Sequence, residues 1–363
     1  MEIRRRETRK IFVGNVPVGG DAPISVQTMT KTFTHHKKKT LEQIKKCHSA
    51  GCEIIRVAVP DEKSIRSFEW IKKNSPIPVV ADIHFNYKLA LDAISAGADC
   101  VRINPGNIGG ERTVEMIVKR AEEAGIPLRI GVNSGSLERE VLEKFGSPSP
   151  EALSFSAKKW CIFLEEKLGF KNFKVSIKST DPMTTVRANI LFSSQTDVPL
   201  HIGITESGTS FSGGIRSAAG LTLLLSNGIG DTIRVSLPAH PLFEVLAGIH
   251  ILNSLGLRKF EGVKVIACPV CGRCQVNVQK IADEVEKRTM FIKKPITIAV
   301  MGCVVNGPGE ARFADIGVVG GKNSFLLYLK GKKVKKVEPK DLLKTLMRMI
   351  EETPEPIQMV GKF

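Results

Sequence analysis

Apolar and polar positions alternate along residues 24–256 in one repeating unit, a short apolar run rich in β-branched residues followed by a longer stretch with apolar residues three or four apart. The first pattern is typical of a buried strand and the second of an amphipathic helix. Eight such runs predict strands at residues 24–30, 53–60, 78–85, 100–104, 128–133, 174–179, 200–206 and 232–237.

Glycine follows five of the predicted helices, at Gly51, Gly97, Gly125, Gly169 and Gly230. A left-handed residue at the end of a helix favours glycine. Strands that alternate with helices predict parallel pairing, and eight units over about 230 residues fit an α/β fold of the (β/α)8 TIM-barrel type. An open doubly wound sheet is the alternative, which is weakened because no Gly-x-Gly-x-x-Gly turn follows the first strand.

Both flanks of this repeat have a different pattern. Residues 10–18, closed by residues 19–21, predict a hairpin that plugs the floor of the barrel. After residue 256 we expect a second, smaller α/β domain. Its predicted strands are 263–267, 296–301, 315–319, 325–329 and 333–337, with helices at 276–287 and 341–351. The barrel domain is therefore placed at residues 1–258 and the second domain at residues 259–363.

The chain of 363 residues is basic, with 53 Lys and Arg against 37 Asp and Glu and a net charge of +16. A solvated basic surface, a nucleic-acid partner, and a multiply anionic small molecule or acidic protein partner all fit this charge. Aromatic residues make up 6% of the chain, with two Trp and two Tyr, which provides few platforms for stacking bases. We therefore expect no nucleic-acid partner.

Membrane and secretory segments are not predicted. No run approaches the roughly 20 uncharged apolar residues of a membrane helix, and the first ten residues lack the apolar stretch of a secretory signal. The sequence therefore predicts a cytoplasmic protein with no membrane partner.

Five of the eight predicted strands carry a cation inside an otherwise apolar run. These cations are Arg56, Arg102, Arg129, Lys178 and Arg234. Strands of a parallel barrel end at the face where active sites form, and a charge buried there without a partner is costly. The clearest nearby acids are Asp82 and Glu206, with Glu53 at a strand start. Pairing with carboxylates on neighbouring strands is one interpretation. Because so few acids are available, the pattern favours a bound anion about the size of a diphosphate, which arginine binds bidentately.

Three further polar residues lie at strand ends. Glu206 is the one acid at a strand end opposite several cations, so it is a candidate proton donor or acceptor, or else a salt-bridge partner for one arginine. His84 fits a substrate contact and a core histidine equally well. Asn133 and Ser236 can donate hydrogen bonds to a bound anion.

The eight cysteines of a cytoplasmic chain are expected to be free thiols, metal ligands or catalytic groups rather than disulfides. Four occur singly among apolar residues and are expected to be small buried hydrophobic side chains: Cys47, Cys52, Cys100 and Cys161. The other four fall within 36 residues: Cys268, Cys271, Cys274 and Cys303. Their spacing favours an iron–sulfur cluster, and a structural zinc site with Cys274 as the fourth ligand stays open.

Seven segments together carry a resemblance to a known family, at residues 56–60, 101–109, 128–137, 202–206, 230–237, 268–273 and 301–310. In this order they resemble the 4-hydroxy-3-methylbut-2-enyl diphosphate synthases, in their two-domain bacterial form. These oxidoreductases catalyse the penultimate step of non-mevalonate isoprenoid biosynthesis. The resemblance extends from near residue 10 to beyond residue 320.

The resemblance implies a [4Fe-4S] cluster held by Cys268, Cys271, Cys303 and Glu310, with Cys274 outside the ligand set. It implies the substrate 2-C-methyl-D-erythritol 2,4-cyclodiphosphate, which is opened and dehydrated to (E)-4-hydroxy-3-methylbut-2-enyl diphosphate with two electrons delivered through the cluster. Carried over to this chain, the five strand cations with Asn133 and Ser236 bind the substrate. Glu206 supplies a proton to the departing hydroxyl.

The resemblance also implies a flavodoxin or ferredoxin as electron donor. It implies a homodimer in which the cluster domain of one chain closes over the barrel of the other. His35 and His36 stand where an acidic residue is expected, and nothing in the sequence explains them. Two other classes compete with this function: a redox-neutral barrel enzyme on a phosphorylated substrate with a structural zinc domain, and a nucleic-acid-binding protein.

Overall fold

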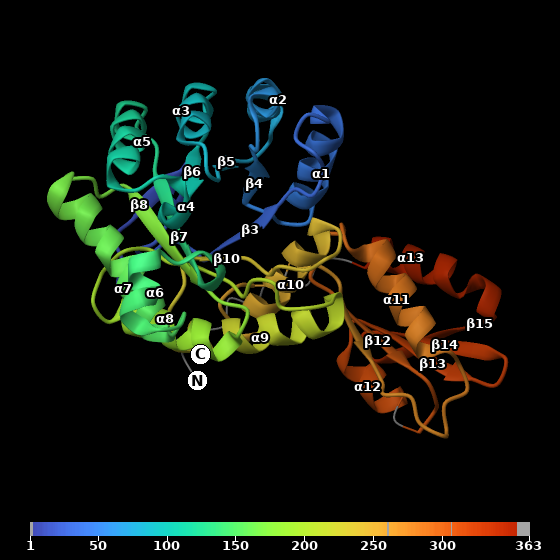
Figure 1. Cartoon of the computed structure of the whole chain (residues 1–363). Helices are drawn as coiled ribbons and strands as arrows, with labels where there is room; N and C mark the ends of the chain where they lie inside the picture. The colour runs from blue at the N-terminus through green and yellow to red at the C-terminus, as the bar shows by residue number, and fades with distance from the viewer. Residues whose placement is uncertain (1–2, 260, 306, 354–363) are drawn as a thin grey trace. The chain divides into compact units, whose positions relative to one another are not determined.

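A computed structural model describes residues 3–259, 261–305 and 307–353 (Figure 1). The chain divides into two compact units, Met1–Lys259 and Phe260–Phe363. Each unit has its own hydrophobic core, and each is described separately below.

The first unit opens with a two-stranded antiparallel hairpin, β1 (Ile11–Val13) and β2 (Val16–Val18). The hairpin turns at Gly14 and Asn15, so the prediction that residues 19–21 close it is wrong. Gly14 has a φ of 58°, a left-handed conformation that a side chain disfavours. The hairpin packs on Ile54, Val80 and Cys100, which lie at or near the starts of three barrel strands, so it covers the floor of the barrel as predicted.

Eight parallel strands follow and form the barrel, which confirms all eight predicted strands and the predicted fold class. They are β3 (Ser25–Met29), β4 (Ile54–Ala58), β5 (Val79–Asp82), β6 (Cys100–Ile103), β7 (Leu128–Asn133), β8 (Phe173–Lys178), β9 (His201–Ile202) and β10 (Thr232–Ile233). Each strand pairs with its neighbour from β3 to β8, and β10 pairs with both β3 and β9. A parallel bridge between Val175 and Leu200 joins β8 to the start of β9 and closes the ring.

Helices surround the strands on the outside of the barrel (Figure 1). They are α1 (Lys37–Ser49), α2 (Glu62–Asn74), α3 (Tyr87–Ser95), α4 (Pro105–Ile108), α5 (Glu111–Glu123), α6 (Arg139–Phe145), α7 (Pro150–Ile162), α8 (Pro182–Ser193), α9 (Ser210–Ser226) and α10 (Pro241–Ser254). A 3-10 turn at Ser134–Ser136 and a π-helical segment at Phe163–Lys167 complete the unit. The five glycines predicted to end helices all have positive φ.

The core of the barrel unit lies between the strands and the helices. It consists of aliphatic side chains such as Ile55, Val57 and Val101 from the strands and Phe68 and Leu89 from the helices. The alternate strand residues point to the barrel axis, where many side chains are polar or charged. The barrel therefore separates an apolar outer layer, which stabilises the fold, from a polar axis.

The second unit contains a five-stranded mixed sheet in the order β11 (Lys264–Ala267), β12 (Thr297–Met301), β13 (Ile316–Gly321), β14 (Ser324–Leu329) and β15 (Lys332–Val337). The first three strands are parallel, and β14 and β15 form the predicted antiparallel hairpin. Helices α11 (Val278–Thr289) and α13 (Leu342–Glu352) are also confirmed, and both contribute side chains to this unit's core.

The Asn-Gly-Pro-Gly sequence of residues 306–309 has the turn chemistry that predicts an exposed loop. Residue 306 lies outside the described residues, and for residues 307–309 the prediction is wrong, because they begin the helix α12 (Gly307–Phe313). Pro308 lies in the first turn, where backbone N–H groups have no acceptor within the helix. Proline lacks this N–H, so it is compatible with the helix at this position. Gly307 is buried against Val319 and Met301, so closely that a Cβ at this position would lie 2.5 Å from Cγ1 of Val319.

In the part of the chain that the structure describes, no helix has both the length and the apolar character needed to cross a membrane.

The buried carboxylate of Asp231 joins the N-terminal segment to the barrel, and its removal is expected to destabilise the first unit. Asp231 is 2% exposed and accepts hydrogen bonds from Arg5 (2.8 Å), Thr8 (3.2 Å) and the backbone N–H of Leu200 (2.8 Å). In Asp231→Asn, an amide replaces one acceptor oxygen and leaves the arginine without its counter-charge. We expect a loss of about 3 kcal/mol in the free energy of unfolding.

Urea unfolding followed by tryptophan fluorescence measures this loss, because both tryptophans of the chain, Trp70 and Trp160, belong to the barrel unit. The matched control is Asp21→Asn, which removes an exposed carboxylate paired with Lys10. The control should leave the midpoint unchanged. Equal effects of the two substitutions would contradict the structural role given to Asp231.

Candidate functional site

A pocket of about 120 Å³ lies at the carboxyl ends of the barrel strands. Its lining includes all seven barrel residues that the sequence predicts to bind an anion: Arg56, Arg102, Arg129, Asn133, Lys178, Arg234 and Ser236. Asp82, His84, Ser176 and Thr205 complete the lining. The structure therefore brings together side chains that are separated by up to 180 residues of sequence.

Strand register explains why these side chains converge. Asp82, Arg102 and Arg129 are direct neighbours across β5, β6 and β7, since Asp82 is in register with Arg102 and Arg102 with Arg129. Asn133 and Lys178 are likewise in register at the ends of β7 and β8. Residues in register on parallel strands point the same way, so one row of polar positions becomes one wall of the pocket.

Two glycines make room for the cations. A Cβ at Gly131 of β7 would lie 2.8 Å from Nε of Arg102, closer than real Cβ contacts occur. A Cβ at Gly203, just after β9, would clash with the backbone carbonyl of Arg234 and would lie 3.0 Å from Nζ of Lys178. Gly131 therefore serves the close approach of a charged side chain, and Gly203 serves the close approach of both a backbone carbonyl and Lys178.

Asp82 is the carboxylate of the pocket, and it is 6% exposed. Its oxygens lie 3.3 Å from Arg102, 3.8 Å from Arg56 and 3.4 Å from Nε2 of His84. Burial by itself raises the pKa of Asp82, but the neighbouring Arg56, His84 and Arg102 outweigh it and hold the pKa well below its usual range. Asp82 is therefore ionised and oriented by its cations, and it is poorly suited to donate a proton.

Glu244 of α10 is a second buried carboxylate, 1% exposed, and the sequence analysis did not identify it. It lies 3.2 Å from Arg234 and 2.9 Å from Lys31, and it accepts from Thr28 and the N–H of Leu237. Burial opposes ionisation, but Arg234 and the hydrogen bonds lower the pKa of Glu244 overall. Glu244 thereby holds Arg234 in position at the edge of the pocket, from the side of α10.

Two cations of the pocket have no carboxylate partner among the described residues. Arg129 is 1% exposed, and its Nε and Nη1 atoms make no hydrogen bond there. Lys178 is 6% exposed and takes part in no described ion pair. Burial, followed by repulsion from the neighbouring arginines, lowers the pKa of both groups well below their usual values. Such buried and unmatched positive charge is what a polyanion would neutralise.

Glu206, the predicted proton-transfer residue, lies beside this pocket but does not line it. It follows Thr205, which does line it, and precedes the buried Ser207. The Glu206 side chain is exposed and makes no hydrogen bond or ion pair in the described structure. Its φ of 51° is left-handed, which is uncommon and strained for a residue with a side chain, and such strained residues cluster at functional sites.

The sequence carried a signal for some of the residues that were missed. Ser176 lies between Lys174 and Lys178 on β8, so period-two alternation places it on the same inner face as both lysines. Glu244 stands as a single acid within the apolar run of α10, where an unpaired carboxylate would be costly. Both patterns are readable, but only the closed barrel shows which residues lie opposite them.

The four clustered cysteines of the second unit lie in loops next to the ends of β11 and β12. Cys268 directly follows β11, and Cys303 follows β12 by one residue beyond Gly302. Cys271 is exposed, and Cys268, Cys274 and Cys303 are half-buried. Glu310 is exposed in the first turn of α12, the helix that follows Cys303. Cys268 accepts a hydrogen bond from the N–H of Gly302 at 3.2 Å.

The four clustered cysteines and Glu310 are not arranged as ligands of a single metal ion. Within residues 3–259, 261–305 and 307–353, no three His, Cys, Asp or Glu side chains surround one point as a single metal ion would need. In a four-iron cluster each iron takes a different protein ligand, so its donors lie around the group rather than at a point. The thiols of Cys268, Cys271 and Cys303 are half-buried or exposed and follow the ends of two adjacent strands. Together with the exposed carboxylate of Glu310, they fit the donor set of such a cluster.

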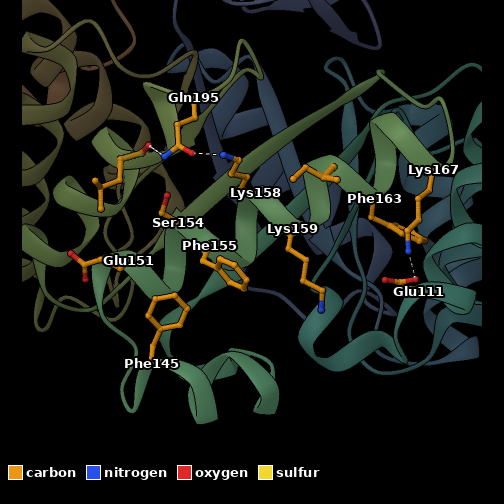
Figure 2. Close-up of a pocket in the computed structure, with 12 residues that line it drawn as sticks. Glu111, Phe145, Glu151, Ser154, Phe155, Lys158, Lys159, Phe163, Lys167 and Gln195 are labelled. Carbon is orange, nitrogen blue, oxygen red and sulfur yellow. Dashed lines mark hydrogen bonds and ion pairs between the residues drawn. The ribbon is translucent and has the colours of Figure 1, made fainter.

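A larger cavity of about 610 Å³ lies on the outer surface of the barrel, against α5, α7, the π-helical segment and α8 (Figure 2). Phe145, Phe155 and Phe163 supply aromatic side chains to its wall. Its lysines are already paired: Lys158 with Gln195 at 2.6 Å, Lys159 with Glu140, and Lys167 with Glu111 at 3.3 Å. None of the predicted site residues lines it, so the axial pocket is the candidate site.

Comparison with known proteins gives two domain families in this order along the chain. The GcpE TIM-barrel domain matches residues 8–249, and the GcpE protein C-terminal domain matches residues 264–352. The Xanthomonas albilineans dihydropteroate synthase in complex with 7,8-dihydropteroate is 15% identical, with a TM-score of 0.50 over 68% of this chain and 97% of that chain. At this identity the likeness shows the barrel fold alone.

Whole-length relatives are also found. A protein of Caldanaerobacter subterraneus subsp. tengcongensis is 55% identical over 348 residues, which cover 96% of this chain and 98% of the relative. A protein of Aquifex aeolicus is 51% identical over 349 residues, which cover 96% of this chain and 97% of the relative. Both relatives are named 4-hydroxy-3-methylbut-2-en-1-yl diphosphate synthase (flavodoxin).

Lys178 is expected to take up a proton when the axial pocket binds a polyanion. Burial and nearby cations lower its pKa in the empty pocket, which favours the neutral amine there. A bound anion reverses this and raises the pKa, and the affinity should therefore fall as the pH rises. Lysine can change its charge in this way, whereas arginine stays protonated.

Calorimetric titration with inorganic pyrophosphate at pH 8, in two buffers with different heats of ionisation, measures this uptake. Lys178→Met should abolish the buffer dependence and weaken binding by about tenfold. Lys171→Met is the matched control, since this exposed lysine precedes β8 on the same strand connection. Identical heats in both buffers for the unaltered protein would contradict the uptake.

Proposed function

The chain belongs to the GcpE family, and from that premise we propose how its own residues carry out the family's reaction. It is an oxidoreductase of isoprenoid biosynthesis that converts 2-C-methyl-D-erythritol 2,4-cyclodiphosphate to (E)-4-hydroxy-3-methylbut-2-enyl diphosphate. The observation that carries the proposal for the site is the gathering of five cations in one small axial pocket with a single carboxylate in its lining.

We assign substrate binding to the axial pocket. Arg56, Arg102, Arg129, Lys178 and Arg234 hold the diphosphate, because their charge exceeds that of Asp82 and the more distant Glu244. Asn133 and Ser236 donate hydrogen bonds from the pocket wall. Asp82 and Glu244 orient three of the arginines, so that the guanidinium groups are in place before the anion arrives. The ring of the cyclic diphosphate is then opened within a fixed frame of positive charge.

We assign proton transfer to Glu206. A hydroxyl leaves the substrate as water, so a proton donor is needed beside the diphosphate. Asp82 and Glu244 are unsuitable because their pKa values are lowered and their oxygens are already paired. Glu206 has no such partner within the described residues, and its neighbour Thr205 lines the pocket. The strained backbone at Glu206 supports a role at this position that a relaxed loop would not require.

We propose that the second unit holds a [4Fe-4S] cluster through Cys268, Cys271, Cys303 and Glu310. When bound, the cluster would relay to the substrate the two electrons of the reductive ring opening, which come from an external electron donor. The three thiols are accessible and stand on two adjacent strand ends, and Glu310 is presented by the first turn of the helix that follows Cys303. Cys274 stays outside the set, because its thiol donates to the carbonyl of Val276 at 3.0 Å.

The names of the relatives support a flavodoxin as the electron donor, and a basic chain suits a small acidic carrier. A ferredoxin would meet the same requirement. We further propose that the enzyme acts in the cytoplasm as a homodimer, as the resemblance implies.

Iron, acid-labile sulfide and zinc content of anaerobically purified protein test the proposed cofactor. Close to four iron and four sulfide per chain, with a broad visible absorption band, are expected, because one [4Fe-4S] cluster per chain contains four of each. One zinc and no sulfide after anaerobic reconstitution would remove the electron path. The barrel would then be a redox-neutral enzyme on a phosphorylated substrate with a structural zinc unit.

Glu206→Gln is expected to keep cluster content and substrate affinity but to lose turnover by about a hundredfold or more, since the amide cannot transfer the proton. Steady-state turnover with a chemical reductant, beside calorimetric substrate binding, separates the two effects. The matched control is Glu62→Gln, an exposed carboxylate in the first turn of α2, which follows a barrel strand on the same face. Turnover retained by Glu206→Gln would refute the assigned role, whatever the cluster content.

A further inference from the structure

Cys274 is the one clustered cysteine that the proposed function leaves without a role. It begins the segment between the Cys271 turn and α11, and its backbone N–H donates to the carbonyl of Cys271 at 2.9 Å. Its thiol is half-buried against the core of the second unit, together with Cys268. Cys274 therefore places a fourth sulfur beside the three proposed cluster ligands.

Gly302 shows how close Cys274 lies to Cys268. A Cβ added at Gly302 would clash with Sγ of Cys274 and would lie 3.5 Å from Sγ of Cys268. Both sulfurs therefore lie close to the same point, the position of a Cβ on Gly302. The distance between the two sulfurs cannot exceed the sum of their distances from that point. Cys268 Sγ also accepts the N–H of Gly302 at 3.2 Å, which fixes one sulfur of the pair against this glycine.

We propose that Cys268 and Cys274 form a reversible disulfide when the cluster is lost to oxidation, and that this disulfide protects the ligand Cys268 until the cluster is rebuilt. The proposal rests on the assignment of Cys268 as a cluster ligand. Cys274 is suited to be the resolving thiol because it holds no iron and therefore stays available beside the ligand.

The chemistry is balanced with a peroxide as the oxidant. One sulfur of the pair takes an oxygen from hydrogen peroxide as the O–O bond breaks, giving a sulfenic acid and one water. The second thiol attacks that sulfur, forms the S–S bond and expels the hydroxyl as a second water. Two thiols are oxidised by two electrons and one peroxide is reduced by two. Without the second thiol, the sulfenic acid can be oxidised further to sulfinic acid, which thiol reductants do not reverse.

The barrel cysteines are poor partners for Cys268. Burial raises the pKa of Cys47, Cys52, Cys100 and Cys161, so the barrel thiols are protonated and shielded. The sulfur of Cys274, in contrast, lies against Gly302, the same glycine that the sulfur of Cys268 contacts.

Peptide mapping of the full chain tests the pairing. Iron content is measured first on anaerobic holoprotein, the cluster is then removed with a chelator, and the apoprotein is exposed to stoichiometric hydrogen peroxide and alkylated. Trypsin cleaves after Arg273, so Cys274 leaves in peptide 274–280 and Cys268 in peptide 265–273. A disulfide-linked pair of these peptides is expected, and fragmentation between Cys268 and Cys271 identifies the bonded cysteine.

Cys274→Ser is expected to abolish the linked peptide, to keep the iron content of the untreated holoprotein, and to reduce the fraction of cluster rebuilt after peroxide and thiol reductant. Cys161→Ser, a buried thiol of the barrel, is the matched control and should retain the linked peptide. Free Cys274 after peroxide, or a disulfide between other clustered cysteines, would overturn the proposal. A linked peptide in a protein that never holds iron would refute the cofactor and the protective role while leaving the pairing in place, so the two failures are distinguishable.

Discussion

The excess of buried positive charge at the barrel axis is the constraint on which the site depends. Five cations share a small pocket with one lining carboxylate, so the empty pocket combines desolvation with mutual repulsion. Such an arrangement persists only where the surrounding structure is rigid enough to hold it. The closed ring of eight strands, with aliphatic side chains packed outside it, provides that rigidity.

The same constraint explains the positions of the acids. Asp82 bridges Arg56 and Arg102, while Glu244 holds Arg234 from behind, so three of the five cations are oriented by carboxylates. Arg129 and Lys178 are left without a protein counter-ion in the described part of the chain. The pocket is thus prepared for a ligand at the two cations that remain unmatched, and binding relieves the repulsion that the fold maintains.

The barrel and the gathering of cations in its pocket could be predicted from the sequence for a common physical reason. Strand cations such as Arg102 stand out because a charge interrupts a short apolar run that is typical of a buried strand. What the sequence could not predict is which residue from another element lies opposite them, and Glu244 from α10 was missed for this reason. The helix α12 was not predicted, because residues 307–309 have the composition of a turn, while burial of Gly307 and the position of Pro308 allow a helix. Glu310 as a ligand came from the resemblance, since spacing gives no signal for a carboxylate in that set.

The two units also differ in how deeply their cysteines are buried. In the barrel, all four cysteines are buried, and burial raises their pKa values, which keeps the thiols protonated and unreactive. In the second unit, the four cysteines are half-buried or exposed and lie beside strand ends. Metal ligands must be accessible as thiolates, and the same accessibility exposes them to oxidants. The proposed cluster ligands are thus confined to one unit, and the cysteines packed in the barrel are shielded from the same oxidants.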